Sequence, residues 1–258
     1  MTRPRALIVG CGRMGAGRDH QSPLLYNHAA AYQAFPDRVE LLGFVDRVLP
    51  RAEWAAEHWG AGFAGDDVAG ALETLRPEIV SVCTPPSDRA EIIGAADAYG
   101  VPAIWCEKPL ALSDPPKALC QVNYIRRWDS RHMEIRARRH NALRRGADAA
   151  HLFVIAARDV HTVPHFTDLA RWWGIPKANL HYQAFHGPSL YVLREPGETP
   201  GRYQGWRDEA FVGGGVQTGF MERALGNLLD ALEGTAALES PAEEAILSEA
   251  WAEEILNG

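Results

Sequence analysis

Three glycines near the start of the chain have a spacing suited to holding phosphates. Ala6–Val9 is a short apolar run, and Gly10, Gly12 and Gly15 follow it as Gly-x-Gly-x-x-Gly. Such a run is typical of a buried parallel strand. Gly10 would allow a tight turn, Gly12 would let a pyrophosphate approach the backbone, and Gly15 would let a following helix pack closely. The pattern predicts a dinucleotide-binding turn; the alternative is a glycine-rich turn without a ligand.

Lys108 is the first candidate for the chemistry itself. It is one of only three lysines, and it stands in Glu107-Lys108-Pro109, directly after the apolar run Val101–Cys106. An ammonium group beside a redox coenzyme can stabilise a developing alkoxide and relay its proton. The alternative is a structural lysine that pairs with Glu107 or with a helix end.

A second group of titratable residues lies in His161–Asp168. Pro164 suits the first turn of a helix, and His165 and Asp168 would share one helical face. Histidine titrates near neutral pH, so we predict His165 as general acid–base, Asp168 as its orienting group or a hydroxyl ligand, and His161 as a second relay. The alternative for His165 is a hydrogen-bonded residue at a helix start. No metal site is predicted, because Pro164 interrupts the His-x-x-x-His spacing and no third ligand is evident.

The elements of the first half alternate between apolar runs and helical patterns, which predicts a parallel, doubly wound sheet. Further buried strands are expected at residues 39–46, 79–86 and 101–106. Ligands of such sheets bind outside the carboxyl ends of the strands. The glycine turn and the residues that end these three strands are therefore expected along one edge.

Asp46 ends the second strand and is the candidate for the ribose hydroxyls of the coenzyme. It lies further from the glycines than the simplest motif requires, because the loop around residues 21–27 lengthens the connection. The alternative is a surface aspartate that caps a helix. Asp46 favours NAD as the coenzyme. Arg47 follows it and could contact the 2′-phosphate of NADP, so NADP stays open as the alternative. The predicted cofactor-binding residues are Gly10, Gly12, Arg13, Met14, Gly15, Asp46, Arg47, Thr84, Pro85, Pro86, Glu107 and Lys108.

Together these motifs resemble the glucose–fructose oxidoreductase, inositol dehydrogenase and rhizopine-catabolism family (Gfo/Idh/MocA). The resemblance rests on residues 10–15, 45–46, 83–86, 107–109, 124–129 and 165–168. It implies a Rossmann domain, expected at residues 1–122, and an α/β domain with an open, mostly antiparallel sheet, expected at 123–258. It also implies hydride transfer between NAD(P) and a carbon that bears a hydroxyl or carbonyl, often in a sugar or cyclitol.

The chain departs from the family pattern as a short form with a trimmed second domain. Only Ala111–Leu119 separates the Glu-Lys-Pro motif from the next strand, Arg89 stands where the family often has histidine, and His161 stands where it has an acid. A nucleotide sugar is a further possible substrate. The predicted substrate contacts are Tyr124, Arg126, Arg127 and His165, although a surface salt bridge is nearly as plausible for each arginine.

The second half is expected to mix helices and strands. A basic helix is expected at 131–145, strands at 152–157, 179–185 and 189–193, a loop at 194–206, a flexible glycine turn at 213–215, and helices at 220–232 and 242–256. We expect the charged side chains of this basic helix to be solvated or to contact a partner.

Composition bounds the class of protein. The chain has 258 residues, 47% of them apolar, and a net charge of −7, which argues against nucleic-acid binding. No apolar run approaches the length of a membrane span. The four cysteines lack metal-ligand spacing, and the first residues do not resemble a secretory signal, so a cytoplasmic protein is expected.

Three functions remain open from the sequence. The first is an NAD(P)-dependent oxidoreductase acting on a small sugar-like or cyclitol-like molecule. The second is an NAD(P)-dependent reductase of an imine or another biosynthetic intermediate on the same fold. The third is a regulator that senses NAD(P) without catalysis. An open sheet would leave a face to cover, so a homodimer or homotetramer is expected.

Overall fold

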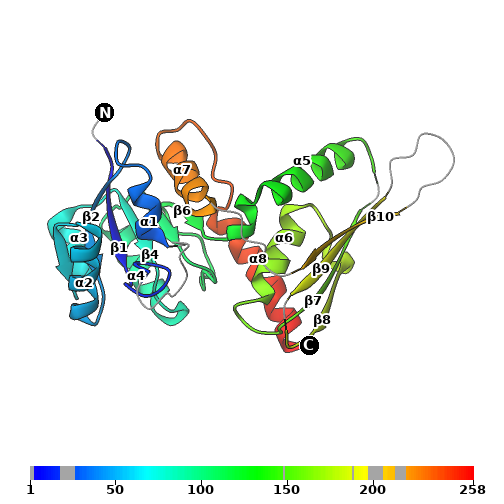
Figure 1. The fold of residues 1–258 in the computed structure, drawn as a ribbon, viewed down its shortest axis with the longest axis horizontal. Coiled ribbons are helices and arrows are strands. Elements are labelled where there is room, and N and C mark those ends of the chain that lie inside the picture. Colours follow the sequence, from blue (N-terminus) through cyan, green and yellow to red (C-terminus); the bar gives the residue numbers. More distant parts are fainter. Residues whose placement is uncertain (1–2, 18–26, 148, 188, 197–205, 213–218) are drawn as a thin grey trace. The chain divides into compact units, whose positions relative to one another are not determined.

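The computed structural model describes residues 3–17, 27–147, 149–187, 189–196, 206–212 and 219–258, which form two compact units (Figure 1). Unit 1 comprises the described residues up to Ile125 together with Gly219–Ile246. Unit 2 comprises the described part of Arg126–Val212 together with Leu247–Gly258. The sequence predicts a boundary after residue 122, and the two units divide between Ile125 and Arg126. Residues 219–246, however, pack with the N-terminal unit.

Unit 1 is built on a six-stranded parallel sheet. Its strands are β1 (Arg5–Val9), β2 (Glu40–Val45), β3 (Phe63–Gly65), β4 (Ile79–Val82), β5 (Ala103–Cys106) and β6 (Leu119–Val122). The order is β3-β2-β1-β4-β5-β6, and each neighbouring pair is parallel. This is the predicted doubly wound sheet. It places β1, with Leu7 and Ile8 fully buried, in the middle of the core.

Local signals mark several of the helix ends in unit 1. They are α1 (His28–Gln33), α2 (Leu49–Trp59), α3 (Val68–Leu75), α4 (Pro86–Ala98) and α7 (Phe220–Leu232). The side chains of Asn27 and Asp67 cap α1 and α3, and Gly60 ends α2 in the left-handed conformation. The strand expected at 79–86 ends at Val82, and Pro86 opens α4, because proline is well accommodated in a first helical turn.

Helix α7 joins unit 1 through bonds to the end of its sheet. Gln121 Nε2 donates to Ala224 O over 2.7 Å, and Asn123 Nδ2 lies 3.4 Å from Met221 Sδ. Leu225 and Leu228 are fully buried. The amphipathic pattern predicts such a helix, but not which sheet it covers.

Unit 2 contains a four-stranded sheet with helices packed on one face. Its elements are the 3₁₀ turn Ile125–Trp128, α5 (Ser130–Arg144), β7 (His151–Ala156), α6 (Val163–Trp172), the 3₁₀ turn Lys177–Asn179, β8 (Leu180–Ala184), β9 (Leu190–Pro196) and β10 (Trp206–Val212). The order is β10-β9-β7-β8; only β7 and β8 pair in parallel. Helix α8 (Ala242–Asn257) contributes its first turn to unit 1 and the rest to unit 2.

The strand pairings confirm the expected mostly antiparallel sheet, and its core lies against α5 and α6. Ile135 of α5, Phe166 of α6, and Leu152 and Leu193 of the sheet are fully buried in one cluster. The expected loop at 194–206 is wrong in part, because β9 runs on to Pro196 and pairs with β10. The expected glycine turn at 213–215 lies outside the described residues.

The basic helix α5 uses several of its charges within unit 2. Arg131 Nε lies 2.8 Å from Glu209 Oε1 of β10, and Arg138 Nη2 lies 2.5 Å from Glu195 Oε2 of β9 and 3.0 Å from Glu209 Oε2. These ion pairs fasten the helix to the two strands. The charged face of α5, which the sequence predicts to be solvated or to contact a partner, therefore packs in part against strands of the same unit.

Candidate functional site

The three glycines form the predicted turn after β1. Gly10 has a φ of +96°, and a Cβ there would lie 2.8 Å from the carbonyl carbon of Cys83. A Cβ on Gly15 would lie 1.8 Å from the Gly10 oxygen. Around Gly12, by contrast, no atom of the described residues lies within 4 Å of the Cβ position. Two glycines are needed for the turn itself, whereas Gly12 leaves space through which a pyrophosphate could approach the backbone.

The helix after the glycine turn contains an insertion. His28 N donates to Met14 O over 2.8 Å, and Ala29 N donates to Gly15 O over 3.0 Å. In an uninterrupted α-helix, residues 18 and 19 would make these two bonds. Helix α1 therefore continues the helical turn that begins after Gly12, with residue 28 in the place of residue 18, so ten additional residues separate the two parts. Gln21–Tyr26, most of the loop expected to lengthen this connection, lies outside the described residues.

Asp46 ties the end of β2 to the glycine turn. Its Oδ2 accepts from Cys11 N over 2.8 Å and its Oδ1 from Val48 N over 2.9 Å. It follows Gly15 by 31 positions, or 21 without the ten additional residues, close to the roughly 20 of dinucleotide-binding motifs. A carboxylate has about four acceptor sites, so these bonds leave capacity for ribose hydroxyls. Arg47, the next residue, is exposed.

The segments after β4 and β5 are joined by Arg89 of α4, a buried residue that the list of predicted site residues does not contain. Its Nε and Nη2 donate to Thr84 O over 3.0 and 2.8 Å, and its Nη1 donates to Pro109 O. β4 and β5 are adjacent, so one guanidinium fixes the spacing of both segments. Pro85 is exposed and Pro86 half-buried beside them.

Glu107 is bonded inside unit 1, which revises the coenzyme contact predicted for it. It is 6% exposed, and its Oε1 accepts from His28 Nε2 over 3.2 Å and from Asn123 Nδ2 over 2.6 Å. Burial alone would raise the pKa of Glu107, but the hydrogen bonds of His28 and Asn123 and the charge of Arg89 outweigh it and lower the pKa. An ionised carboxylate thus anchors the segment that carries the half-buried Lys108.

Burial favours the thiol form of Cys83 and Cys120. Burial raises the pKa of Cys83 well above its ordinary value, and the charge of Glu107 adds to the effect. Burial does the same at Cys120. All four cysteines are free, and the nucleophilic form of cysteine is the thiolate. Covalent cysteine chemistry therefore has no support here.

Asp168 and Arg127 form a buried ion pair in unit 2, which revises the roles predicted for both. Arg127 Nη2 lies 2.6 Å from Asp168 Oδ1, and Arg127 Nε lies 3.0 Å from Oδ2. Each side chain is 1% exposed. Ser248 Oγ donates to the same carboxylate over 3.4 Å. Neither side chain is open to solvent, so the arrangement suits a structural pair that fixes α6.

The two histidines of unit 2 that are predicted as site residues lie at the start of α6. His165 is half-buried in the first turn, whereas His161 is exposed just before it. Asp159 Oδ1 accepts from the N–H groups of His161 and Thr162 over 2.8 and 2.9 Å. Burial would raise the pKa of Asp159, but these bonds lower it below its ordinary value. An acid that sequence reasoning missed therefore lies two residues before the position where the resemblance implies one.

Arg126 and Tyr124 differ as candidate substrate contacts. Arg126 is half-buried, with its guanidinium carbon 4.9 Å from the Phe166 ring centroid. Burial lowers the pKa of Arg126, against the effect of Tyr191. Tyr124 is fully buried in the core of unit 1, so its predicted substrate contact is revised to packing.

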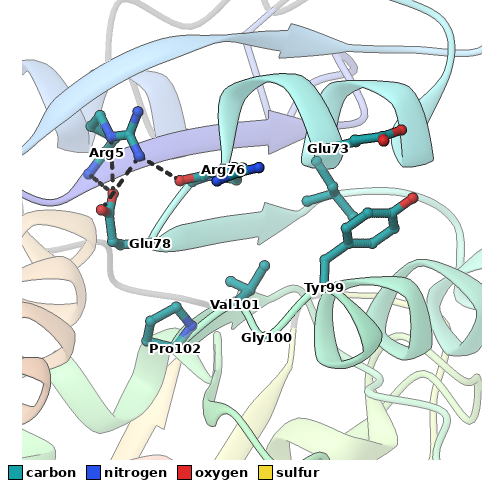
Figure 2. Close-up of a pocket in the computed structure, with 10 residues that line it drawn as sticks. Arg5, Glu73, Arg76, Glu78, Tyr99, Gly100, Val101 and Pro102 are labelled. Atoms are coloured by element: carbon teal, nitrogen blue, oxygen red, sulfur yellow. Dashed lines mark hydrogen bonds and ion pairs between the residues drawn. The ribbon is translucent and has the colours of Figure 1, made fainter.

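A hollow of about 610 Å³ lies at the opposite edge of the unit 1 sheet (Figure 2). Arg5 Nη2 donates to Arg76 O over 2.7 Å, and Arg5 Nε pairs with Glu78 Oε2 over 3.3 Å. The ends of α3 and α4, at Arg76 and Tyr99, line this hollow. Helix C-termini carry partial negative charge, so this edge has the wrong polarity for phosphates.

Among the residues that the structure describes, no group of three or more His, Cys, Asp or Glu is arranged to hold a metal ion. No helix in the same residues is long and apolar enough to cross a membrane.

The N-terminal half of the chain matches a family model. Residues 5–123 match the model GFO_IDH_MocA, described as an oxidoreductase family with an NAD-binding Rossmann fold. D-glucoside 3-dehydrogenase of Escherichia coli K12 is 29% identical over 119 residues, which cover 46% of this chain and 31% of that protein. Inositol 2-dehydrogenase of Streptomyces avermitilis is 25% identical over 142 residues, covering 50% and 38%. The match thus spans less than half of each relative.

Solved structures resemble the chain over nearly its whole length. An oxidoreductase from Agrobacterium radiobacter in complex with NAD+, L-tartaric acid and magnesium has a TM-score of 0.71 and 12% identity, with 100% of this chain and 97% of that chain covered. The WlbA dehydrogenase from Bordetella pertussis in complex with NADH and UDP-GlcNAcA has a TM-score of 0.71 and 15% identity, with 99% and 97% covered. At these identities the likeness concerns the fold alone.

The parallel sheet, the glycine turn and the second α/β unit define a protein with an NAD-binding Rossmann fold. Residues 5–123 are similar to the model of the Gfo/Idh/MocA oxidoreductase family. The fold expected from the resemblance is confirmed.

Proposed function

We propose that this protein is an NAD-dependent dehydrogenase. It would transfer hydride between nicotinamide and a hydroxyl- or carbonyl-bearing carbon of a sugar, nucleotide sugar or cyclitol-like molecule. The observation that carries the proposal is the edge of unit 1, where the glycine turn, Asp46, Thr84 and Lys108 follow strands β1, β2, β4 and β5. The names of the relatives, a glucoside and an inositol dehydrogenase, support the substrate class.

The glycine turn and Asp46 would hold the coenzyme. The open space at Gly12 suits the pyrophosphate, with Arg13 and Met14 continuing the turn beside it. Asp46 would accept hydrogen bonds from ribose hydroxyls. Its negative charge disfavours a 2′-phosphate, which supports NAD over NADP despite the exposed Arg47.

Lys108 would handle the proton of the reacting hydroxyl. The bound nicotinamide would supply hydride acceptance or donation. Lys108 lies two residues after the end of β5, at the end of the sheet where ligands of such folds bind. The positive charge of its ammonium group would stabilise an alkoxide as the hydroxyl proton leaves. The Glu107 carboxylate and the Arg89 guanidinium hold the backbone on either side of it.

His165 would act as the general acid–base of unit 2, with His161 as a second relay and Arg126 as a substrate contact. Imidazole is the side chain most often used as a general acid or base in catalysis. Asp159 binds the backbone of His161 and would place a negative charge beside that histidine. Asp168 would act indirectly, by fixing α6 through Arg127.

We also infer that the open face of the unit 2 sheet pairs with a second copy of the chain, giving a homodimer or homotetramer. Phe153, at 36% exposure, stacks on His181 with ring centroids 4.6 Å apart, and Arg194 lies 5.5 Å from the same ring. An exposed apolar sheet face of this kind is typical of an interface. Phe153→Asp should reduce the oligomer mass seen by light scattering, whereas Leu247→Asp, on α8, should not.

We infer a cytoplasmic location from the thiols. The four free cysteines include three that are buried in the Rossmann unit, where a reduced thiol behaves as a small apolar side chain. Fractionation of cells that produce the protein would test this inference; recovery from an oxidising compartment would contradict it.

The test of function is reduction of NAD+ with inositols, alkyl glucosides and UDP-sugars, followed through the absorbance of NADH. The wild type should oxidise at least one class. Lys108→Met should abolish turnover while NAD+ still raises the unfolding temperature, and Lys117→Met, at an exposed lysine, should behave as wild type. Full activity of Lys108→Met would contradict the proposal. Coenzyme binding without turnover of any class would instead favour the regulator.

A further inference from the structure

A chain of buried polar side chains runs beneath the segment that carries Lys108. Tyr32 Oη lies 2.8 Å from Ser81 Oγ, and Ser81 Oγ lies 3.1 Å from His28 Nδ1. His28 Nε2 lies 3.2 Å from Glu107 Oε1, which also accepts from Asn123 Nδ2 over 2.6 Å. All five residues belong to unit 1, and none is more than 6% exposed.

The chain of bonds has one direction in which each donor finds an acceptor. Burial raises the pKa of Tyr32, so its hydroxyl stays protonated and donates to Ser81. The Ser81 hydroxyl then donates to His28 Nδ1, and His28 Nε2–H donates to the Glu107 carboxylate. The bond to Glu107 therefore requires a hydrogen on His28 Nε2.

His28 connects the glycine turn to the Lys108 segment. Its backbone N–H donates to Met14 O over 2.8 Å, within that turn. Its ring reaches Glu107, the residue before Lys108, and lies 3.7 Å from the Trp105 ring centroid on β5. A single fully buried residue thus touches both halves of the proposed coenzyme edge.

Apolar side chains would fill the centre of the sheet without the cost of burying polar groups. A series of buried polar side chains joined by hydrogen bonds therefore indicates a role beyond packing. We find that role at Glu107, where the series of bonds ends. The Glu107 carboxylate cannot move without breaking its bonds to His28 and Asn123, and Lys108 is the next residue. Fixing Glu107 fixes the backbone from which the lysine projects.

We propose that His28 is a positioning residue for Lys108, acting through Glu107. It holds the lysine in a set place relative to the glycine turn and does not itself touch the substrate or the coenzyme. The inference rests on the proposed function for its effect on turnover, but not for the contact itself.

Two substitutions separate the two ends of the ring. His28→Gln places an amide nitrogen near the position of Nε2 and keeps a donor for Glu107. His28→Asn reaches only the position of Nδ1, so it keeps the contact with Ser81 and loses the one with Glu107. Tyr32→Phe is the matched control, because it breaks the far end of the chain and leaves the His28–Glu107 bond intact.

The readout is the side-chain NMR signal of Lys108 in coenzyme-free protein grown with isotope-labelled lysine. Only three lysines are present, at 108, 117 and 177, so single Lys→Arg variants assign every signal. His28→Asn should shift the Lys108 signal and the midpoint of its pH titration. His28→Gln and Tyr32→Phe should leave both at the wild-type values, and the other two lysines should not change in any variant.

Turnover should follow the same order. His28→Asn should lose about 10²-fold in kcat with little change in the KM for NAD+, as expected when a reacting group is displaced by about 1 Å, and His28→Gln should restore it. If His28→Asn does not fold, His28→Phe takes its place, since it keeps the ring against Trp105 without a donor.

An unchanged Lys108 signal in His28→Asn, or in His28→Phe where it replaces that variant, would overturn the proposal. Equal changes in Tyr32→Phe would do the same, because they would mark a general loss of stability. Full activity of Lys108→Met would refute the proposed function instead, while the Lys108 signal would still report whether His28 positions the lysine.

Discussion

The carboxylate of Asp46 and the backbone N–H of Cys11 are 2.8 Å apart, joined by a hydrogen bond to a charged acceptor. This bond couples the end of β2 to the glycine turn. The residue proposed to bind the ribose therefore also shapes the place where the phosphates would lie. One substitution should affect both.

Asp46→Ala should weaken NAD+ binding by about ten- to a hundredfold, because hydrogen bonds to a charged group contribute about 1.5–3 kcal/mol. It should also reduce the preference for NAD+ over NADP+, since the negative charge is removed. Calorimetric titration measures both affinities. Glu40→Ala, at the exposed start of β2, is the control. Unchanged NAD+ affinity in Asp46→Ala would show that the carboxylate plays no part in binding.

Alanine at Gly15 and at Gly12 should have opposite effects on folding. A Cβ on Gly15 would lie 1.8 Å from the Gly10 oxygen, so Gly15→Ala should destabilise unit 1 strongly. Gly12→Ala meets no described atom and should stay within about 0.5 kcal/mol of the wild-type free energy of unfolding. Denaturant unfolding compares the two. A large loss of stability in Gly12→Ala would contradict the open space at that position.

Asp168→Asn should lower the free energy of unfolding by about 3–5 kcal/mol, because it leaves the buried Arg127 without its counter-charge. The double variant Arg127→Met/Asp168→Leu should recover most of the loss. Denaturant unfolding is again the measurement. If Asp168→Asn abolished turnover and left stability unchanged, Asp168 would be a catalytic residue rather than a structural one.

The stability of unit 2 should fall as the pH drops from 6.5 towards 4. Burial lowers the pKa of His132 from 6.5 to about 4, and the charge of Arg126 acts in the same direction against Asp129. Between these values the unfolded chain binds a proton that the folded chain does not, so folding becomes less favourable as the pH falls. Thermal unfolding at several pH values should show a shallower decline in His132→Gln. Parallel curves would exclude this histidine as the source.

The parts of the fold and site that follow from the sequence are those set by local signals. The glycine turn, the strand ends at Asp46 and Lys108, and the opening of α6 at Pro164 each depend on residues close together in the chain. The long separation between the glycines and Asp46 also has a local cause, because ten additional residues precede α1.

The parts that could not be predicted depend on distant partners. Glu107 is paired with His28, 79 positions away, and Asp168 with Arg127, 41 positions away. The sequence pattern predicts that Glu107 lies at a strand end and Asp168 on a helix face. It does not show which buried side chain bonds to each of them. The sequence therefore predicts Glu107 as a coenzyme contact and Asp168 as the orienting group of His165 or a hydroxyl ligand.

Strand β10 was missed for a related reason. Residues 207–209 are charged, which breaks the alternation expected of a strand. Arg131 and Arg138 of α5 pair with Glu209, so its charge is neutralised by tertiary contacts. A charged stretch that looks like a loop in the sequence becomes an edge strand once its partners are in place.

Calorimetric titration of NAD+ into the wild type and into Gly12→Ala tests the central claim most directly. We predict binding at one site per chain in the wild type and its loss in Gly12→Ala, with both proteins equally folded. No binding by the wild type, or undiminished binding by Gly12→Ala, would show that the coenzyme does not lie on the glycine turn.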